Sequence, residues 1–172
     1  MRHLKTAIHP DIKKYNLKTK FTRLSSRAIA IRGNMILMLF TERYNDYSLP
    51  GGGLNDGEDI TDGMIRELTE ETGAKNIREI KAFGTYEEYR PWYKNEYDIQ
   101  HMISYCFTCC IDEELAETKY EVYESNNGMK PIWIDISEAI CYNQDTIKNN
   151  VKKGMSVERE TFLLELIKKE LL

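Results

Sequence analysis

The sequence lacks any apolar run long enough to cross a membrane. A transmembrane helix needs about 20 consecutive apolar residues, and no stretch of even about 18 occurs in this chain. The first eighteen residues also contain no apolar run of the length that a secretory signal requires. These absences predict a soluble, cytoplasmic protein with no membrane partner.

Cysteine is scarce, with four residues in the chain. Cys106 and Cys109 have the C-x-x-C spacing of many metal sites, but they lie in a strand-like run, MISYCFTCCI. Residues three apart in a strand face opposite sides of the sheet. We therefore expect reduced, buried thiols here rather than a metal site.

The chain has no strong excess of charge of either sign. Lys and Arg together number 24 and Asp and Glu 28, which gives a net charge of −4. This balance argues against a nonspecific binder of nucleic acid or of anionic membranes. A free nucleotide is compatible with it, because local cations and a bound metal can offset the charge of a phosphate. We expect a small-molecule nucleotide partner and no nucleic-acid polymer.

Repeats and low-complexity linkers are also missing. A chain of 172 residues has the length of about one domain with a proper core. We predict a single domain over residues 1–172, in which residues 1–24 form an N-terminal extension packed on or near it.

Alternating and apolar runs predict the strands. Residues 27–32 and 35–41 are strand-like and are separated by Gly33-Asn34, a two-residue hairpin signal. Further strands are predicted at residues 77–86, 101–111 and 131–134. The aromatic segment 87–97 between two of them is predicted to be a loop.

Three segments are predicted to be helical. Residues 61–72 follow a candidate N-cap at Asp59 or Thr61 and precede Gly73, a typical C′ residue. Ser137 is a candidate N-cap for a short helix. Ser156 is another, for an amphipathic C-terminal helix that we expect to dock on the sheet. Strands broken by two or three helices indicate an α/β or α+β fold.

The helix at residues 61–72 carries a cluster of carboxylates. Glu67, Glu70 and Glu71 fall within an arc of about 100°, because positions i, i+3 and i+4 share one face of a helix. Like charges at this spacing repel, and a cation relieves the repulsion. Oxygen ligands without His or Cys favour Mg²⁺ or Mn²⁺. A simple solvated acidic face is the alternative interpretation.

Two neighbouring features favour the metal site over that alternative. Arg66 can fix the rotamer of a glutamate through a charge-assisted contact, and Glu58 is a candidate partner for its guanidinium. Glycines 51–53 allow a sharp turn before the helix, so that a backbone carbonyl can approach the same metal.

Residues 52–74 combine these features in one pattern, G-x5-E-x7-REL-x-EE-x-GA. Its nine fixed positions would coincide by chance roughly once in 10⁹ starting points at average residue frequencies. The segment resembles the complete signature of the Nudix hydrolase family, including its MutT-like members. This resemblance implies an α/β/α sandwich around a mixed β-sheet, with the signature as a loop-helix-loop between strands.

The resemblance also implies an activity and roles for residues. Nudix enzymes hydrolyse a pyrophosphate bond in a nucleoside diphosphate linked to another moiety, with Mg²⁺ or Mn²⁺ as cofactor. Substrates of that kind include nucleoside triphosphates, oxidised nucleotides, ADP-ribose and nucleotide sugars. By position, the metal ligands would be Glu67, Glu70, Glu71 and the carbonyl of Gly51.

The remaining roles follow from the same alignment of positions. Glu67, oriented by Arg66, would serve as general base, with Glu70 as a further catalytic residue. The residues expected to be structural within the motif are Gly52, Glu58 and Gly73. Many relatives recruit one more acid from outside the motif, and the candidates here are Glu121, Glu124, Glu87 and Glu88.

Substrate-binding residues are predicted on two segments. The run from Tyr86 to Lys94 combines rings with cations that can stack a base and hold a phosphate, and its candidates are Arg90, Trp92 and Tyr93. A packed surface loop is the alternative for this run. Arg43, shortly before the glycines, is a further candidate.

Two other functions are compatible with the sequence. A nucleotide-sensing Nudix domain would bind without turnover, although the intact glutamates argue against it. An isomerase-like Nudix enzyme acting on prenyl diphosphates would need Cys106 or Cys109 to face the pocket. The family resemblance is also compatible with a homodimer.

Overall fold

One mixed sheet organises the computed structural model, which describes residues 1–14, 19–94, 96–150 and 153–172. In those residues the strands are β1 (His3–Ile8), β2 (Lys20–Arg32), β3 (Met35–Thr41), β4 (Asp46–Ser48), β5 (Arg78–Pro91), β6 (Ile99–Cys110) and β7 (Met129–Asp135). Their order is β1-β5-β6-β2-β3-β4, and β7 pairs with β3. The β1–β5 and β2–β6 pairs are parallel and the others antiparallel.

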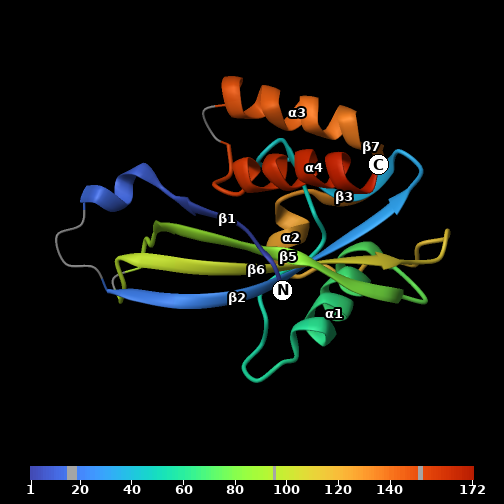
Figure 1. Ribbon diagram of the computed structural model, residues 1–172, viewed down its shortest axis with the longest axis horizontal. Coiled ribbons are helices and arrows are strands. Elements are labelled where there is room, and N and C mark those ends of the chain that lie inside the picture. Colours follow the sequence, from blue (N-terminus) through green and yellow to red (C-terminus); the bar gives the residue numbers. More distant parts are fainter. Residues whose placement is uncertain (15–18, 95, 151–152) are drawn as a thin grey trace.

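Helices cover both faces of this sheet (Figure 1). The helical elements are η1 (Pro10–Lys14), α1 (Ile60–Thr72), α2 (Val122–Asn126), α3 (Ile136–Asn149) and α4 (Val157–Leu171). Helix α1 lies on one side of the strands, and α3 and α4 lie together on the other. The predicted α/β/α sandwich is confirmed.

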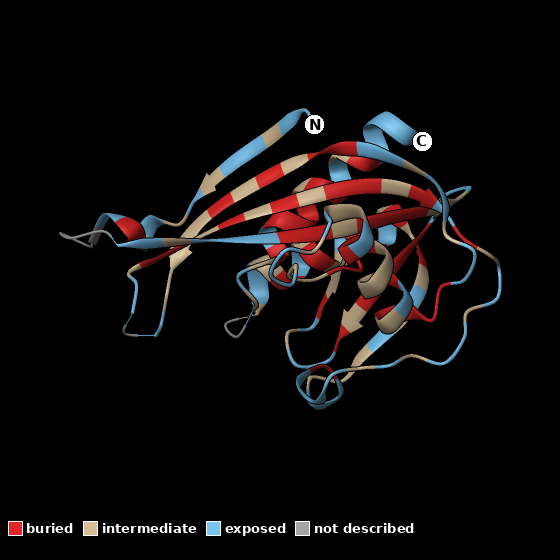
Figure 2. Ribbon diagram, turned by 90° about the horizontal axis from the view of Figure 1, so that it is seen from below, coloured by how far each residue is buried: buried red, intermediate tan, exposed pale blue. Residues whose placement is uncertain are grey.

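Two hydrophobic clusters correspond to the two sides. One joins the strands to α3 and α4 and includes Leu163 and Ile167, so the C-terminal helix docks on the sheet as expected. The other joins the strands to α1 through Met64 and Leu68. Figure 2 shows the buried residues along the strands and on the helix faces turned toward them. Burial of this apolar surface on both sides of one sheet stabilises the sandwich.

The cysteine prediction is confirmed by these clusters. Cys106 belongs to the cluster on the α4 side and Cys109 to the one on the α1 side, so the two thiols face opposite sides of β6. Both are buried and free.

Some predicted boundaries were wrong. Residues 87–91 are not part of a loop: β5 continues to Pro91 because its backbone pairs with β6, as in the Tyr89–His101 and Arg90–Gln100 partners. The helix near residue 137 is long, at 14 residues, and its N-cap is Asp135, whose Oδ1 accepts from the N–H of Ser137 at 2.8 Å. The short helix α2 was not predicted.

The N-terminal residues add an edge strand to the sheet, since β1 pairs with β5 in parallel. The assignment of residues 1–172 to one domain stays a prediction. No helix within the described ranges has the length and apolar character needed to span a membrane.

Candidate metal and nucleotide site

Local sequence fixes both ends of α1. Oδ1 of Asp59 accepts hydrogen bonds from the N–H groups of Thr61 at 2.8 Å and Asp62 at 3.2 Å, which satisfies two free donors of the first turn. Gly73 ends the helix with a φ of 70°, and a Cβ there would overlap the backbone oxygen of Ala116. Both ends were predicted, and the apolar residues Met64 and Leu68 between them turn one face of α1 toward the sheet.

Three glutamates meet at the buried edge of α1. One carboxylate oxygen each of Glu67, Glu71 and Glu124 lies within 4.8 Å of the other two. The first two come from α1 and the third from α2, more than fifty residues later in the chain. Glu71 and Glu124 are each 5% exposed, so this acidic cluster is largely shielded from water.

The buried carboxylate of Glu71 has one close backbone donor. The N–H of Gly51 donates to its Oε2 at 2.6 Å. Burial raises the pKa of Glu71 to about 8, against the opposing effects of this hydrogen bond and of the Arg27 guanidinium. The neighbouring residues therefore compensate only part of the negative charge.

Gly51 can reach this position only because it has no side chain. Its φ is 136°, and a Cβ would overlap the backbone oxygen of Ser26. Its carbonyl, predicted to be a metal ligand, accepts a hydrogen bond from Nη1 of Arg27.

Arg66 connects the signature loop to the cluster. Its Nε and Nη2 donate to the two oxygens of Glu58 at 2.7 and 2.9 Å. Its Nη1 donates to Oε1 of Glu67 at 2.8 Å, and Nη2 also donates to the carbonyl of Gly53 at 3.2 Å. The hydrogen bond with Arg66 is the main reason that the pKa of Glu58 falls to about 2. Burial raises the pKa of Glu67, although Arg66 opposes the shift.

Glu70 lies outside the group of three. Its side chain is 42% exposed and contacts Nη1 of Arg66 at 3.3 Å. Glu124 completes the cluster instead. It is one of the four candidate acids outside the motif, among which the sequence did not discriminate.

The other three of those acids lie elsewhere. Glu121 lines the pocket beside the cluster. Glu87 pairs with His101 at 3.0 Å on the sheet surface, and Glu88 is buried against Arg90 at 2.7 Å.

The predicted substrate-binding residues are not gathered at the cluster. Arg90 is held by Glu88, and Arg43 donates to the side chain of Asn127 at 3.1 Å. Trp92 packs on Phe21 with ring centroids 4.9 Å apart, and Tyr93 is 76% exposed.

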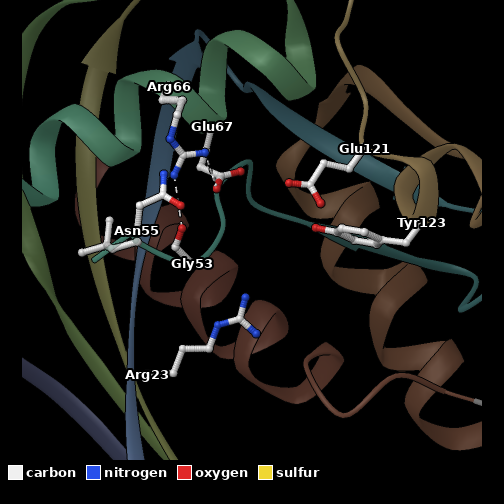
Figure 3. Close-up of a pocket in the computed structure, with 8 residues that line it drawn as sticks. Arg23, Gly53, Asn55, Arg66, Glu67, Glu121 and Tyr123 are labelled. Atoms are coloured by element: carbon white, nitrogen blue, oxygen red, sulfur yellow. Dashed lines mark hydrogen bonds and ion pairs between the residues drawn. The ribbon is translucent and has the colours of Figure 1, made fainter. Parts of the chain in front are cut away.

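A different set of residues lines the pocket beside Glu67, a hollow of about 410 Å³ shown in Figure 3. These residues are Arg23, Gly53, Leu54, Asn55, Arg66, Glu67, Glu121 and Tyr123. In Figure 3, Arg23 enters from β2 on the side opposite Glu67, and Tyr123 enters from α2. Sequence reasoning missed Arg23 and Tyr123, because no motif connects them to the signature. It also missed Asn55, which occupies a variable position inside the signature.

The donor set of the cluster fits a hard divalent cation. All three side chains offer carboxylate oxygens, and no thiolate or imidazole belongs to this group. The raised pKa of Glu71 reports a buried negative charge that its neighbours do not fully offset. A bound cation would provide that compensation.

The fold and the site together define a sandwich protein whose acidic helix faces a polar pocket. The family model for the NUDIX domain matches residues 22–155, and the chain belongs to the Nudix family. The signature predicted from residues 52–74 lies inside the matched range.

One curated relative is the RNA pyrophosphohydrolase of Bartonella quintana (strain Toulouse). It is 38% identical over 88 residues, which cover 42% of this chain and 47% of the relative. The chain thus spans about half the length of the curated relative that it matches.

Solved structures share the fold. The MutT protein of Bacillus halodurans has a TM-score of 0.54 at 18% identity and covers 77% of this chain and 83% of its own. A NUDIX hydrolase from Nitrosomonas europaea has a TM-score of 0.56 at 17% identity, with 81% and 88% covered.

Proposed function

We propose that this protein is a metal-dependent pyrophosphohydrolase that cleaves a pyrophosphate bond in a nucleoside diphosphate linked to another moiety. The observation that carries the proposal is the meeting of Glu67, Glu71 and Glu124 within 4.8 Å, in a largely buried cluster beside a polar pocket. Membership of the Nudix family and the name of the B. quintana relative support it.

The proposed cofactor is Mg²⁺ or Mn²⁺, held by the three clustered carboxylates. When bound, such an ion neutralises the charge of a pyrophosphate and makes water a stronger nucleophile at neutral pH. The Gly51 carbonyl and Glu70 remain further candidates, and the Arg27 contact of Gly51 would have to yield for its carbonyl to serve.

The chain's own residues have definable tasks in this scheme. Arg66 holds Glu67 through Oε1, which leaves Oε2 of Glu67 free of that contact. Glu67 also has a raised pKa, which suits a carboxylate that takes a proton from water near neutral pH. We assign Glu67 as general base and Arg66 as the residue that orients it.

Glu58 and the glycines keep this arrangement in place. Glu58 fixes the other edge of the Arg66 guanidinium and accepts a hydrogen bond from the N–H of Asn55 at 2.8 Å. Gly52 lies directly against the Glu67 carboxylate, which a Cβ would approach to 2.6 Å. Gly73 ends α1.

The proposed substrates are nucleoside triphosphates, oxidised nucleotides, ADP-ribose and nucleotide sugars, in the cytoplasm. The name of the B. quintana relative adds RNA to these candidates. A homodimer also stays a prediction, which light scattering after size-exclusion chromatography would test.

The cysteine-dependent isomerase is disfavoured by the structure. Burial raises the pKa of Cys106 to about 12 and that of Cys109 to about 11, so neither thiol is activated.

The experiment is product release from a panel of these substrates with Mg²⁺, with Mn²⁺ and with a chelator. Metal-dependent cleavage of at least one compound is expected. The Glu71→Gln variant should lose it, while Glu138→Gln, which changes an exposed carboxylate on α3, should retain it. Binding without cleavage across the panel would instead identify a nucleotide-sensing domain.

A further inference from the structure

The pocket beside the acidic cluster continues along β2. A second hollow of about 460 Å³ is lined by residues 21–24 of β2 and by residues 54–58 of the signature loop. Arg23, Leu54 and Asn55 line both hollows. One groove therefore leads from Glu67 past Arg23 to Phe21.

Arg23 offers an uncommitted cation at the middle of this groove. Its side chain is exposed, and no described residue forms a hydrogen bond or ion pair with its guanidinium. The guanidinium lies against Gly53, where a Cβ would come within 2.6 Å of Nη2. Figure 3 shows it directed into the pocket, with Glu67 on the far side. A free guanidinium in that position suits a phosphate group.

Phe21 lines the distal end of the groove, and two further rings pack next to it outside the lining. Phe21 shares a face of β2 with Arg23, because alternate residues of a strand point the same way. Its ring packs edge-on against Trp92 at 4.9 Å, and the Trp92 ring packs on Tyr93 at 4.6 Å. Nζ of Lys94 lies 5.8 Å from the Trp92 centroid. We call Phe21, Trp92 and Tyr93 the aromatic platform.

A mononucleotide bound at the cluster would not explain a groove that extends to Phe21, at the edge of the aromatic platform. Rings next to cations are the combination that binds single-stranded nucleic acid, since every base has a face that stacks. The net charge of −4 argues against broad electrostatic binding of a polymer. Asp56, Glu58 and Glu121 also line the two hollows, and Arg66 pairs with Glu58. With one arginine and a nearby lysine, such a short site needs to hold only one or two nucleotides.

We propose that this groove binds the nucleotide that follows the reacting 5′ end of a single-stranded oligonucleotide. Arg23 binds the phosphate that joins the first two nucleotides, and the aromatic platform stacks on the second base. This assignment rests on the proposed function, because the 5′ polyphosphate must be held at the acidic cluster. It replaces the expectation of no nucleic-acid polymer.

The test compares substrates that share one 5′ nucleotide and differ in length. Adenosine triphosphate and 5′-triphosphorylated oligoribonucleotides of two and four residues that begin with A are hydrolysed with Mg²⁺. We expect kcat/KM to rise about tenfold or more from the mononucleotide to the dinucleotide, mainly through KM, as stacking of one base would give.

Variants of the platform identify its role. Trp92→Leu and Phe21→Leu should bring the ratio of kcat/KM for the dinucleotide and mononucleotide close to one. Trp92→Phe keeps a ring and should retain most of the preference. The matched control is Ile132→Ala, which truncates an exposed apolar side chain on β7 and should keep the wild-type ratio.

Binding of a fluorescent 5′-monophosphorylated tetranucleotide provides a second readout. Anisotropy should show weaker binding to Arg23→Gln and Trp92→Leu than to the control. Equal kcat/KM for all substrate lengths in the wild-type protein would overturn the groove assignment. So would variants that lower kcat/KM equally for the dinucleotide and the mononucleotide. Absence of metal-dependent cleavage of every substrate would overturn the proposed function instead.

Discussion

Arg66 and Glu58 form two parallel hydrogen bonds, with Nε to Oε1 at 2.7 Å and Nη2 to Oε2 at 2.9 Å. The pair lies eight residues apart and fixes the guanidinium whose remaining nitrogen holds Glu67. One planar side chain thereby sets the orientation of a carboxylate on α1 relative to the signature loop.

The Arg66→Lys variant tests this relationship. A single ammonium cannot hold Glu58 and Glu67 in the same fixed geometry, so we expect kcat/KM to fall about 10²-fold through misplacement of Glu67. Arg78→Lys, at an exposed arginine paired with Asp112, is the matched control. Near-normal kinetics in Arg66→Lys would show that the bidentate pair is dispensable.

Glu71→Gln removes a charge from the acidic cluster while keeping the shape of the side chain. Turnover should fall by about 10³-fold, because a carboxylate in contact with the cation stabilises it by several kcal/mol. The far-ultraviolet circular dichroism spectrum should stay unchanged. Titration calorimetry with Mg²⁺ should show weakened binding, and wild-type affinity would refute the metal assignment.

Metal affinity should depend on pH through Glu71. In the metal-free protein its pKa is raised to about 8 from an ordinary value of 4.5. A cation must displace that proton below pH 8, so affinity should rise up to about tenfold per pH unit from about pH 6 to 8 and then level off. Calorimetry in buffers of different ionisation enthalpy would report the released proton.

The raised pKa of Glu71 also makes the stability of the folded protein depend on pH. A raised acid pKa means that the folded state binds the proton more tightly than the unfolded chain. Proton binding by Glu71 therefore stabilises the folded state fully below pH 4.5, and this contribution is lost as the pH rises toward 8. Excess Mg²⁺ should therefore raise the melting temperature more at pH 8 than at pH 6, and Glu71→Gln should lack this difference.

A buried charge network supports the loop that carries Gly51. Oε2 of Glu160 accepts from the N–H of Leu49 at 2.9 Å, and its Oε1 accepts from Nη2 of Arg159 at 2.6 Å. Glu160→Leu would leave Arg159, with a 3% exposed side chain, short of one partner. We expect a loss of about 3–5 kcal/mol in the free energy of unfolding.

Urea denaturation would measure that loss. The control is Glu42→Ala, which breaks an exposed pair with Lys130 and should cost less than about 1 kcal/mol. Equal effects of the two variants would show that burial of the network is unimportant.

Two glycines with positive φ allow backbone strain to be distinguished from steric overlap of an added Cβ with its neighbours. Gly33 has a φ of 55°, and an added Cβ there would have no neighbour within 4 Å, whereas Gly73 has a φ of 70° and an added Cβ there would overlap the Ala116 backbone. Gly33→Ala should cost about 1 kcal/mol, and Gly73→Ala at least about 1 kcal/mol more, because only the second forces backbone to move. Thermal melts of both variants would measure the two losses, and a larger loss in Gly33→Ala than in Gly73→Ala would contradict the prediction.

Local patterns in the sequence determined much of this molecule. The caps of α1, the hairpin at Gly33-Asn34 and the Arg66–Glu58 pair all involve residues close in the chain, so their spacing alone specifies them. The two faces of β6 followed from the alternation of strand residues. The longer β5 was not predictable in this way, since pairing with β6 rather than local propensity extends it to Pro91.

The tertiary structure alone decided which groups complete the site. Glu124 reaches Glu71 because β7 and α2 fold back beside α1, and four acids outside the motif were equivalent until that packing was known. Glu70 has the same helical spacing as its neighbours, yet Arg66 and solvent surround it. Arg23 enters the pocket from β2 and precedes the first residue of the signature by about thirty residues of sequence. Spacing determines neighbours along one element, whereas contacts between elements depend on how the whole chain packs.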